Sequence, residues 1–388
     1  MRIVNVAALM LAVLGAQVGC GSSTDTPAAS GTDAGAAGAD GGADAGAGLG
    51  FVPSNVDSVD LSGTLGDIVL RDCGAQIRAG ETGRLACVDP ADRDTPFRYT
   101  EITQADGTKL KVFVVKSLRI PSGVAARVVA SVDPIAIVAL DTIEIEGSLL
   151  VEPGLAGGFA APNADAVGNG PGGGKNASGG GQGDGGGGYC GKGGSGGGAG
   201  AGGGGATYGN AQLSPLLPGS SGAGQFAAPG GGALQLVAKN MIRVGPGGSI
   251  NVGGGGSDQG GAGAGGALLL EAPSVQIAGK IAANGGGGGA GTGSLDGKDG
   301  QLDELPTAAG AGDVRGGGGG AGGAGASVDG QAGVGNSDYP DGNFAGNGGG
   351  GAGRIRINTT SGAAAVTGLV SPSLAGTCGT QGTLRTSR

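Results

Sequence analysis

The stretch GGALQLVAKNMIRVGPGGSINVGG at Gly231–Gly254 is followed by GGALLLEAPSVQIAGKIAANGG at Gly265–Gly286, and the two share one pattern. Each contains an apolar strand, a bend with alanine and a polar residue, a second strand, and a short third strand that ends in glycine. Their apolar residues alternate with a period of two, which is typical of half-buried β-strands. The similarity predicts that both stretches are copies of one structural unit.

Other stretches of the chain follow the same pattern. Ile135–Gly154 reads IAIVALDTIEIEGSLLVEPG, and Gly351–Thr360 reads GAGRIRINTT as a shortened copy. Lys111–Val132 (KVFVVKSLRIPSGVAARVVASV) fits an earlier copy with a corner at Pro121–Gly123. Short strands repeated in a fixed order predict an all-β fold, a single-stranded parallel β-helix over residues 111–388. Stacked units of such a solenoid bury one continuous aliphatic column.

A β-sandwich with disordered glycine loops is the alternative fold. It requires hairpin turns every ~8–12 residues, and such turns are scarce after residue 110. The best hairpin signal lies earlier, at Ile102–Val115 around Ala105–Thr108. Because residues 51–110 carry more charge and less glycine, we expect them to form a small β cap over the first unit of the solenoid.

Glycine supplies 100 of the 388 residues, mostly in insertions at 154–230, 253–266 and 285–351. One interpretation is disorder, because such long loops are uncommon in compact domains. The other starts from Gly316–Ser327 (GGGGGAGGAGAS), where small side chains recur at every third residue. Polyproline II geometry has three residues per turn, so the insertions could form polyglycine II helices bonded side by side. Aromatic side chains would then cover the ends of this layer: Tyr189, Tyr208, Phe226, Tyr339 and Phe344.

The N-terminus has the pattern of an export signal. Arg2 precedes a short apolar stretch, Val6–Leu14, which is shorter than the ~20 residues of a membrane-spanning helix. The small residues before Cys20 resemble the lipobox of bacterial lipoproteins, although Gln17 stands where leucine is usual. The resemblance implies a signal peptide at 1–20, lipidation of Cys20, and an exported protein anchored to the outer membrane or cell surface. Residues 21–50 contain almost no large apolar side chain, which predicts a disordered tether.

Four cysteines remain after Cys20, and an even number fits disulfide bonds in an oxidising compartment. Three pairings are open to them. The short separation of Cys73 and Cys87 favours that pair, which leaves Cys190 with Cys378.

Composition excludes several kinds of chemistry. The chain has no histidine, so the usual catalytic triads and histidine-metal sites are absent. A net charge of −9 argues against a nucleic-acid partner, and Gly174–Lys175 and Gly191–Lys192 lack the serine or threonine of a nucleotide-binding loop. We therefore expect no cofactor.

Calcium is the one open alternative, because it prefers carboxylate and carbonyl oxygens. Two acidic groups match neither the EF-hand spacing nor the nonapeptide calcium repeat, and a solvated loop is the simpler interpretation of both. They are the candidate stretch Asp296, Asp299, Asp303 and Glu304, and a looser group of Asp338, Asp341 and Asn343.

Acidic residues of the repeats are expected on outer faces of the strands: Asp141, Glu144, Glu146 and Glu271. A glycoside hydrolase needs two carboxylates across a cleft, and clustered aromatic residues that line sugar subsites are missing from the sequence. The sequence therefore predicts a protein that is not an enzyme. A carbohydrate-binding or carbohydrate-active β-helix, in one form calcium-dependent, is the alternative.

The glycine-rich segments GGGGGAGGAGASVDG and GGALLLEAPSVQIAGKIAANGGGGGAG resemble bacterial exported proteins described as PE-PGRS-like. The proline-glutamate domain of that family is absent from this sequence. The resemblance implies a cell-surface, glycine-rich β-solenoid. We expect a non-enzymatic lipoprotein with a structural, adhesive or surface-recognition role. It would contact the membrane only through a lipid anchor and take a glycan or a protein as its surface ligand.

Overall fold

The computed structural model describes residues 48–88, 95–179, 181–291, 296–312, 316–335 and 344–386. All of these residues lie in one compact unit. These residues form β-strands and almost no helix. The predicted all-β class is therefore confirmed.

The strands belong to three sheets, in each of which neighbouring strands pair in the following order. The first sheet contains β1 (Asp67–Val69), β6 (Ser117–Ile120), β9 (Thr142–Ile145), β12 (Met241–Val244), β15 (Ser274–Ile277) and β18 (Ala365–Val366). The second contains β19 (Leu369–Ser371), β16 (Lys280–Ala282), β13 (Ser249–Asn251), β10 (Ser148–Val151), β7 (Ala125–Val129), β2 (Gln76–Ala79) and β3 (Gly83–Ala86). The third contains β20 (Gly379–Thr383), β17 (Arg354–Thr359), β14 (Ala267–Glu271), β11 (Ala233–Ala238), β8 (Ile135–Ala139), β5 (Lys109–Val115) and β4 (Arg98–Thr103).

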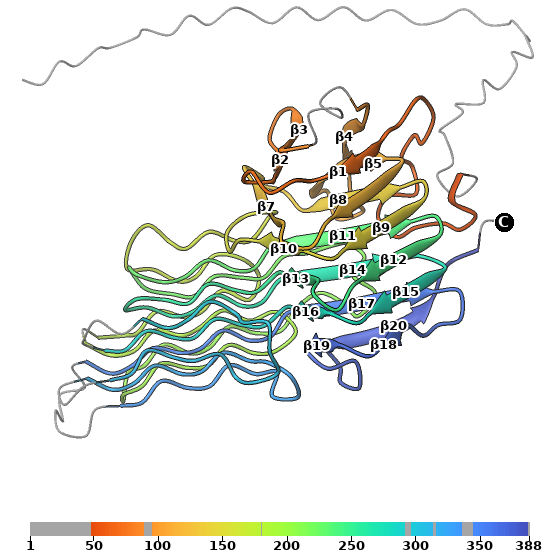
Figure 1. Cartoon of the computed structure of the whole chain (residues 1–388). Helices are drawn as coiled ribbons and strands as arrows, with labels where there is room; N and C mark the ends of the chain where they lie inside the picture. The colour runs from red at the N-terminus through yellow and green to blue at the C-terminus, as the bar shows by residue number, and fades with distance from the viewer. Residues whose placement is uncertain are drawn as a thin grey trace, which may run out of the picture. The chain divides into compact units, whose positions relative to one another are not determined.

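Successive strands fall in different sheets. β8, β9 and β10 belong to the third, first and second sheets, and β11 to β13 and β14 to β16 repeat this order (Figure 1). Strand pairing is parallel except in the β2–β3 and β4–β5 hairpins of the described chain. The β4–β5 hairpin confirms the hairpin predicted at 102–115. Because only these two hairpins occur among the described strands, the sheets do not form a sandwich built from successive hairpins.

The register of the strands matches the alignment of the sequence copies. Ala233 pairs with Ala267, and Leu236 lies between Ile137 and Leu270 on neighbouring strands. Because the side-chain period of a strand is two, this register keeps equivalent aliphatic residues on one face. The copies identified in the sequence are therefore neighbours in space.

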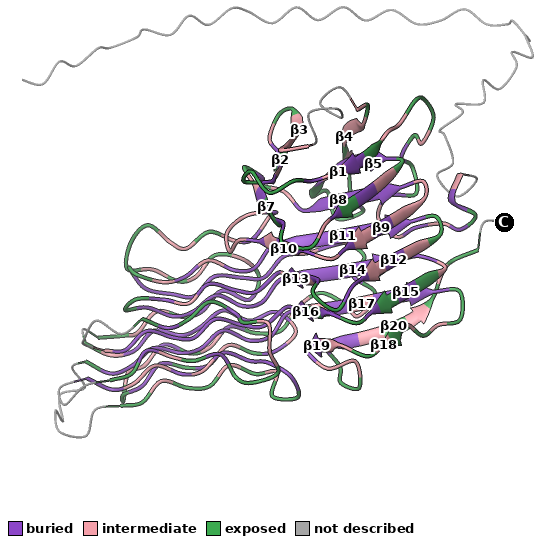
Figure 2. Ribbon diagram, in the orientation of Figure 1, coloured by how far each residue is buried: buried purple, intermediate pink, exposed green. Residues whose placement is uncertain are grey.

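The inward aliphatic side chains form one continuous core that runs from Ile68 to Val370. Figure 2 shows buried residues along the strands of all three sheets. At the N-terminal hairpin, Phe97 and Tyr99 pack on Phe113, with ring centroids 5.9 and 4.8 Å away. Aromatic side chains thus cover the first layer of the core.

A second apolar cluster covers the outer face of the third sheet. Phe51 and Val56 from the N-terminal segment, together with Leu213 and Leu216, pack against strands β5, β8, β11 and β14. Glu271 lies on the outer face of β14, as expected, but the segment around Ser54 covers it. Glu271 is only 2% exposed. Its carboxylate accepts hydrogen bonds from Ser54 N and Oγ, Gln235 Nε2 and Asn358 Nδ2, all at 2.8–2.9 Å.

All three long glycine insertions leave the strands at the same corner. They connect β10 to β11, β13 to β14, and β16 to β17, so each joins the second sheet to the third. We call the described residues within 168–208, 219–231, 253–266 and 285–353 the glycine layer. Its segments run side by side beyond the strands (Figure 1). Repeating the insertion at one corner brings the glycine runs together.

Backbone hydrogen bonds join the segments of the glycine layer with a period of three. In the segment 344–353, every third N–H donates to the same neighbour: Gly346, Gly349 and Ala352 bond to the carbonyls of Val334, Gln331 and Val328. Including the bonds it accepts, this segment is bonded to six others: 184–187, 191–197, 262–265, 286–289, 317–323 and 328–334. Buried peptide groups require such partners. The layer is therefore held by its backbone rather than by side chains.

Glycine is required where two backbones approach each other in this layer. A Cβ atom at Gly205 would overlap the carbonyl oxygen of Gly172, whereas one at Gly203 would meet only Lys175 Cγ at 3.9 Å. Gly205 is buried and Gly203 is exposed. Positions only two residues apart therefore differ in their tolerance of a side chain.

We predict that Gly205→Ala lowers the free energy of unfolding by about 1–3 kcal/mol, because the added methyl group forces the segments apart. Gly203→Ala should leave stability unchanged or raise it by up to ~1 kcal/mol, because it only restricts the unfolded chain. Urea unfolding followed by tyrosine fluorescence measures both variants. Equal effects of the two substitutions would contradict the close packing of the layer.

Candidate functional site

The predicted disulfide pairs are present. Cys73 is bonded to Cys87 and Cys190 to Cys378, with Cα–Cα distances of 5.7 and 5.6 Å. The first bond closes a short loop beside β2 and β3, and the second ties the glycine layer to the chain just before β20. Cys20, the signal peptide and nearly all of the tether lie outside the described residues, so their assignments stay predictions.

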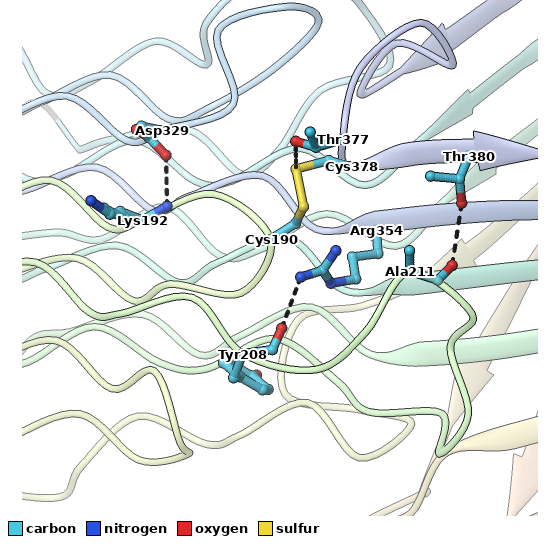
Figure 3. The surroundings of a disulfide bond; sticks show 9 residues. All are labelled: Cys190, Lys192, Tyr208, Ala211, Asp329, Arg354, Thr377, Cys378 and Thr380. Atoms are coloured by element: carbon cyan, nitrogen blue, oxygen red, sulfur yellow. Dashed lines mark hydrogen bonds between the residues drawn. A yellow bond between two sulfur atoms is a disulfide. The ribbon is translucent and has the colours of Figure 1, made fainter.

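An aromatic and cationic cluster lies next to the Cys190–Cys378 bond (Figure 3). The rings of Tyr189 and Tyr208 are 4.7 Å apart, and the guanidinium of Arg354 lies 5.5 Å from the Tyr189 ring centroid. Arg354 Nη2 also donates to the Tyr208 carbonyl at 3.0 Å. Burial raises the pKa of both tyrosines and lowers that of Arg354. This cluster packs the glycine layer against the third sheet.

The calcium candidates do not gather around one point. Asp299 Oδ1 accepts a hydrogen bond from Gly256 N at 2.8 Å, and Asp303 Oδ1 accepts one from Leu305 N at 3.1 Å. Asp296 instead adjoins Asp258, whose pKa is raised by burial and by this second carboxylate. Glu304 is exposed. Across the described ranges, no group of three or more acidic, cysteine or histidine side chains is placed to hold a metal ion. The second acidic group, Asp338, Asp341 and Asn343, lies outside these ranges.

Asp299 lines a groove of about 470 Å³ between the second sheet and the glycine layer. The polar groups of this groove bond to one another: Arg127 pairs with Glu152, and Asn251 Nδ2 donates to the Gly300 carbonyl. Because these polar groups are already paired, the groove offers a ligand few free hydrogen-bond donors or acceptors.

Outer-face acids of the repeats also have partners. Asp141 accepts a hydrogen bond from Asn240 at 2.7 Å, and Glu146 lies 2.6 Å from Arg243. The bond from Arg243 lowers the pKa of Glu146. Glu144 lies 3.8 Å from Arg119. A general acid requires the opposite pKa shift, so Glu146 is suited to its ion pair with Arg243 rather than to acid catalysis.

A different pocket, of about 400 Å³, lies where segments of the glycine layer turn at their ends away from the strands. We call it the distal pocket. It is lined by side chains from five separate stretches of the chain: Asp165, Ser178, Gln182, Asp184, Gln225, Phe226, Gln259, Phe344, Ala345 and Asn347. None of these lining residues is basic. The size lies within the range of small-molecule sites, which is about 300–1,000 Å³.

Asp184 is the central polar residue of the distal pocket. It is 9% exposed, and its Oδ1 accepts a hydrogen bond from Ala177 N at 2.8 Å. Its Oδ2 has no hydrogen-bond partner among the described residues. Gly224, with a φ of +98°, leaves room for this oxygen, since a Cβ atom there would overlap it. Burial raises the pKa of Asp184, and the nearby charge of Asp165 raises it further.

Amide side chains adjoin Asp184. Asn347 fixes the backbone of the pocket, because its Oδ1 accepts from Asp184 N and its Nδ2 donates to the Gly289 carbonyl. Gln182 Oε1 accepts a bond from Gly200 N, which leaves its Nε2 available as a donor. Gln225 forms no hydrogen bond to another described residue and is exposed. The pocket therefore combines one buried acceptor with open amide groups.

Exposed apolar side chains surround this polar centre. Phe226 and Phe344, which line it, are 49% and 42% exposed. Val167 and Val334 are also exposed, and both lie close by in the backbone network: Gly224 N bonds to the Ala166 carbonyl, and Gly346 N bonds to the Val334 carbonyl. Exposed apolar patches rimmed by polar groups mark binding surfaces.

Sequence reasoning missed this site. It expected aromatic residues at the ends of the glycine layer: Tyr189 and Tyr208 lie at the end next to the strands, and Phe226 and Phe344 lie at the distal end. Tyr339 lies outside the described residues. No pattern in the sequence indicated that Asp184 and three glutamines would join the two phenylalanines. The only available signal was the placement of Gln182 and Asp184 inside a glycine run.

Comparisons with protein-family models, curated proteins and solved structures find no significant match. No helix in the described part of the chain has the length and apolar character needed to cross a membrane.

The raised pKa of Asp184 predicts a pH-dependent contribution to stability. A folded-state pKa above 3.8 means that the folded protein binds the proton more tightly than the unfolded chain does. The free energy of unfolding of the wild type should therefore fall, relative to Asp184→Asn, as pH rises from below 3.8 through the folded-state pKa. Urea unfolding of both proteins between about pH 3 and pH 7 measures this difference, and a pH-independent difference would contradict it.

Proposed function

We propose that the three sheets wind as one single-stranded parallel β-helix, with the glycine segments as polyglycine II helices beside it. The repeating order of sheets from β8 to β19 and the common corner of the insertions support the solenoid. Hydrogen bonds with a period of three and bonding to six neighbours support the polyglycine II geometry. In this architecture the aliphatic column fixes one end of each glycine segment, and the opposite ends form the distal pocket.

The function that this architecture supports best is surface recognition by a non-enzymatic protein. The observation that carries it is the distal pocket, where exposed apolar side chains surround a buried carboxylate with an open oxygen. The glycine layer holds these residues on a backbone whose peptide groups are bonded to one another, so the binding groups are preorganised. The outer-face acids are engaged in pairs, which favours binding over catalysis.

Export and anchoring complete the proposal. Two disulfide bonds suit an oxidising compartment outside the cytoplasm. Lipidation of Cys20 would anchor the protein at the outer membrane or cell surface, with residues 21–50 as a tether. The compositional likeness to PE-PGRS-like proteins agrees with a surface role and identifies no ligand.

A carbohydrate-active protein is the second candidate, and one observation favours it. Asp184 combines a raised pKa with a neighbouring carboxylate, Asp165, and glycoside hydrolases use one protonated and one ionised carboxyl group. Release of reducing sugar from a polysaccharide by the wild type, lost in Asp184→Asn, would support this candidate over pure recognition.

We predict that the distal pocket mediates binding of the protein to surfaces. Full-length protein carrying Cys20→Ser is applied to bacterial cells, to a neutral polysaccharide film and to a serum-protein film. The double variant Phe226→Ala, Phe344→Ala should bind at least tenfold more weakly to whichever surface retains the parent protein, because it removes both exposed rings of the pocket.

Leu305→Ala is the matched control, since Leu305 is a 70% exposed apolar residue outside the distal pocket. It should bind as the parent protein does. Recognition through the distal pocket is refuted if no surface retains the parent protein, or if the double variant binds as well as the control.

Lipidation predicts the location of the protein in cells. Cys20→Ser removes the only thiol that the lipobox offers, so the protein should move from the membrane fraction to the soluble fraction of a bacterial host. Fractionation followed by immunoblotting of the wild type and the variant tests this. An unchanged membrane-bound share would argue against a lipid anchor at Cys20.

A further inference from the structure

The ligand chemistry of the distal pocket is set first by its charge. The described residues of its lining include the carboxylates of Asp165 and Asp184 and no lysine or arginine. Anionic ligands such as phosphates and sulfated or acidic sugars are bound by basic side chains, which form charge-assisted hydrogen bonds to them. The distal pocket therefore disfavours anions.

Asp184 requires a hydrogen-bond donor from the ligand. Asp184 as a whole residue is 9% exposed, and its Oδ2 has no hydrogen-bond partner among the described residues. Oδ2 is not one of the buried side-chain atoms that lack a partner in the described structure, so it is accessible from the pocket, where a donor of the ligand can replace water. A hydroxyl group supplies this donor without bringing a charge into the site.

The amides next to Asp184 extend the same chemistry. Among the residues that the structure describes, Gln182 Nε2 has no hydrogen-bond acceptor, and the Gln225 amide has neither a donor nor an acceptor bonded to it. A hydroxyl group donates one hydrogen bond and accepts others, so adjacent hydroxyls of one molecule can bond to a carboxylate and an amide together. Acceptors and donors placed side by side therefore match a molecule with several neighbouring hydroxyl groups.

Phe226 and Phe344 add an apolar surface to this polar centre. Both rings are roughly half exposed although large apolar side chains are rare in the glycine layer. A pyranose ring presents an apolar C–H face and a rim of hydroxyl groups. Such a ring can stack its face on a phenylalanine while its rim bonds to the carboxylate and the amides.

From these observations we propose that the distal pocket binds an uncharged saccharide. Asp184 Oδ2 accepts a hydrogen bond from a sugar hydroxyl, Gln182 and Gln225 bond to neighbouring hydroxyls, and Phe226 packs on the ring face. Gly224 is part of the site, because a side chain there would fill the space of the Asp184 oxygen. The inference rests on the proposed recognition function and names its ligand class.

The test uses full-length protein carrying Cys20→Ser on an array of neutral, amino and acidic mono- and oligosaccharides, with EDTA or with calcium. The protein should bind neutral saccharides in EDTA. Asp184→Asn and Phe226→Ala should each weaken this binding at least tenfold. Because Phe226 is half exposed, its variant tests the site even if Asp184→Asn fails to fold.

Asp329→Asn is the control for the carboxylate. Asp329 Oδ1 accepts a hydrogen bond from Lys192 N at 2.8 Å, the same kind of bond that Asp184 forms, but it does not line the distal pocket. This variant should bind like the parent protein. Thermal unfolding of each variant identifies any loss of structure.

Several outcomes would overturn the inference: a silent array, binding only to acidic or amino sugars, binding that requires calcium, or binding unaffected by both pocket variants. A silent array combined with surface binding that the double phenylalanine variant abolishes would refute the saccharide and leave the recognition function intact. Loss of both kinds of binding in the parent protein would refute the two together.

Discussion

The close approach of backbones in the glycine layer is the constraint on which the rest of the structure depends. Each segment is bonded through its peptide groups to several others, and a Cβ atom at most inward positions would overlap a neighbouring carbonyl. Ordering so much glycine is costly in entropy, because glycine loses more backbone freedom than any other residue. Hydrogen bonds between segments offset that cost only when all of the segments are present together, which makes the layer cooperative.

The sheets supply the register that this cooperativity requires. Every long insertion leaves from the second sheet and returns to the third, so stacked strands set the starting points of the glycine segments at regular intervals. The Cys190–Cys378 bond and the Tyr189–Tyr208–Arg354 cluster fix the layer to the strands near β17 and β20. The aliphatic core and the glycine layer therefore depend on each other. The core positions the segments, and the segments close one side of it.

Much of the fold could be predicted because it is repetitive. The alternation at Leu234–Leu236 and Leu268–Leu270 identified the strands, and the repeat identified which of them are neighbours. The burial of Glu271 could not be predicted, because it depends on Ser54, which is 217 residues away in the sequence. The distal pocket could not be predicted for the same reason. Phe226 and Phe344 come together only through the packing of glycine segments, and glycine runs carry no pattern that specifies which of them are adjacent.

Even so, the size of a side chain inside a glycine run indicates how closely the neighbouring segments approach that position. Where segments approach from several directions, buried side chains are mostly small, as at Ser221 and Ala262, whereas a larger one such as Asp329 is exposed. Asp184 departs from this rule, because it is buried while one of its carboxylate oxygens stays open to the pocket. A glycine or alanine there would avoid the cost of burying a carboxylate. One oxygen of Asp184 accepts the hydrogen bond from Ala177 N, and the recognition that we propose for the distal pocket would use the other.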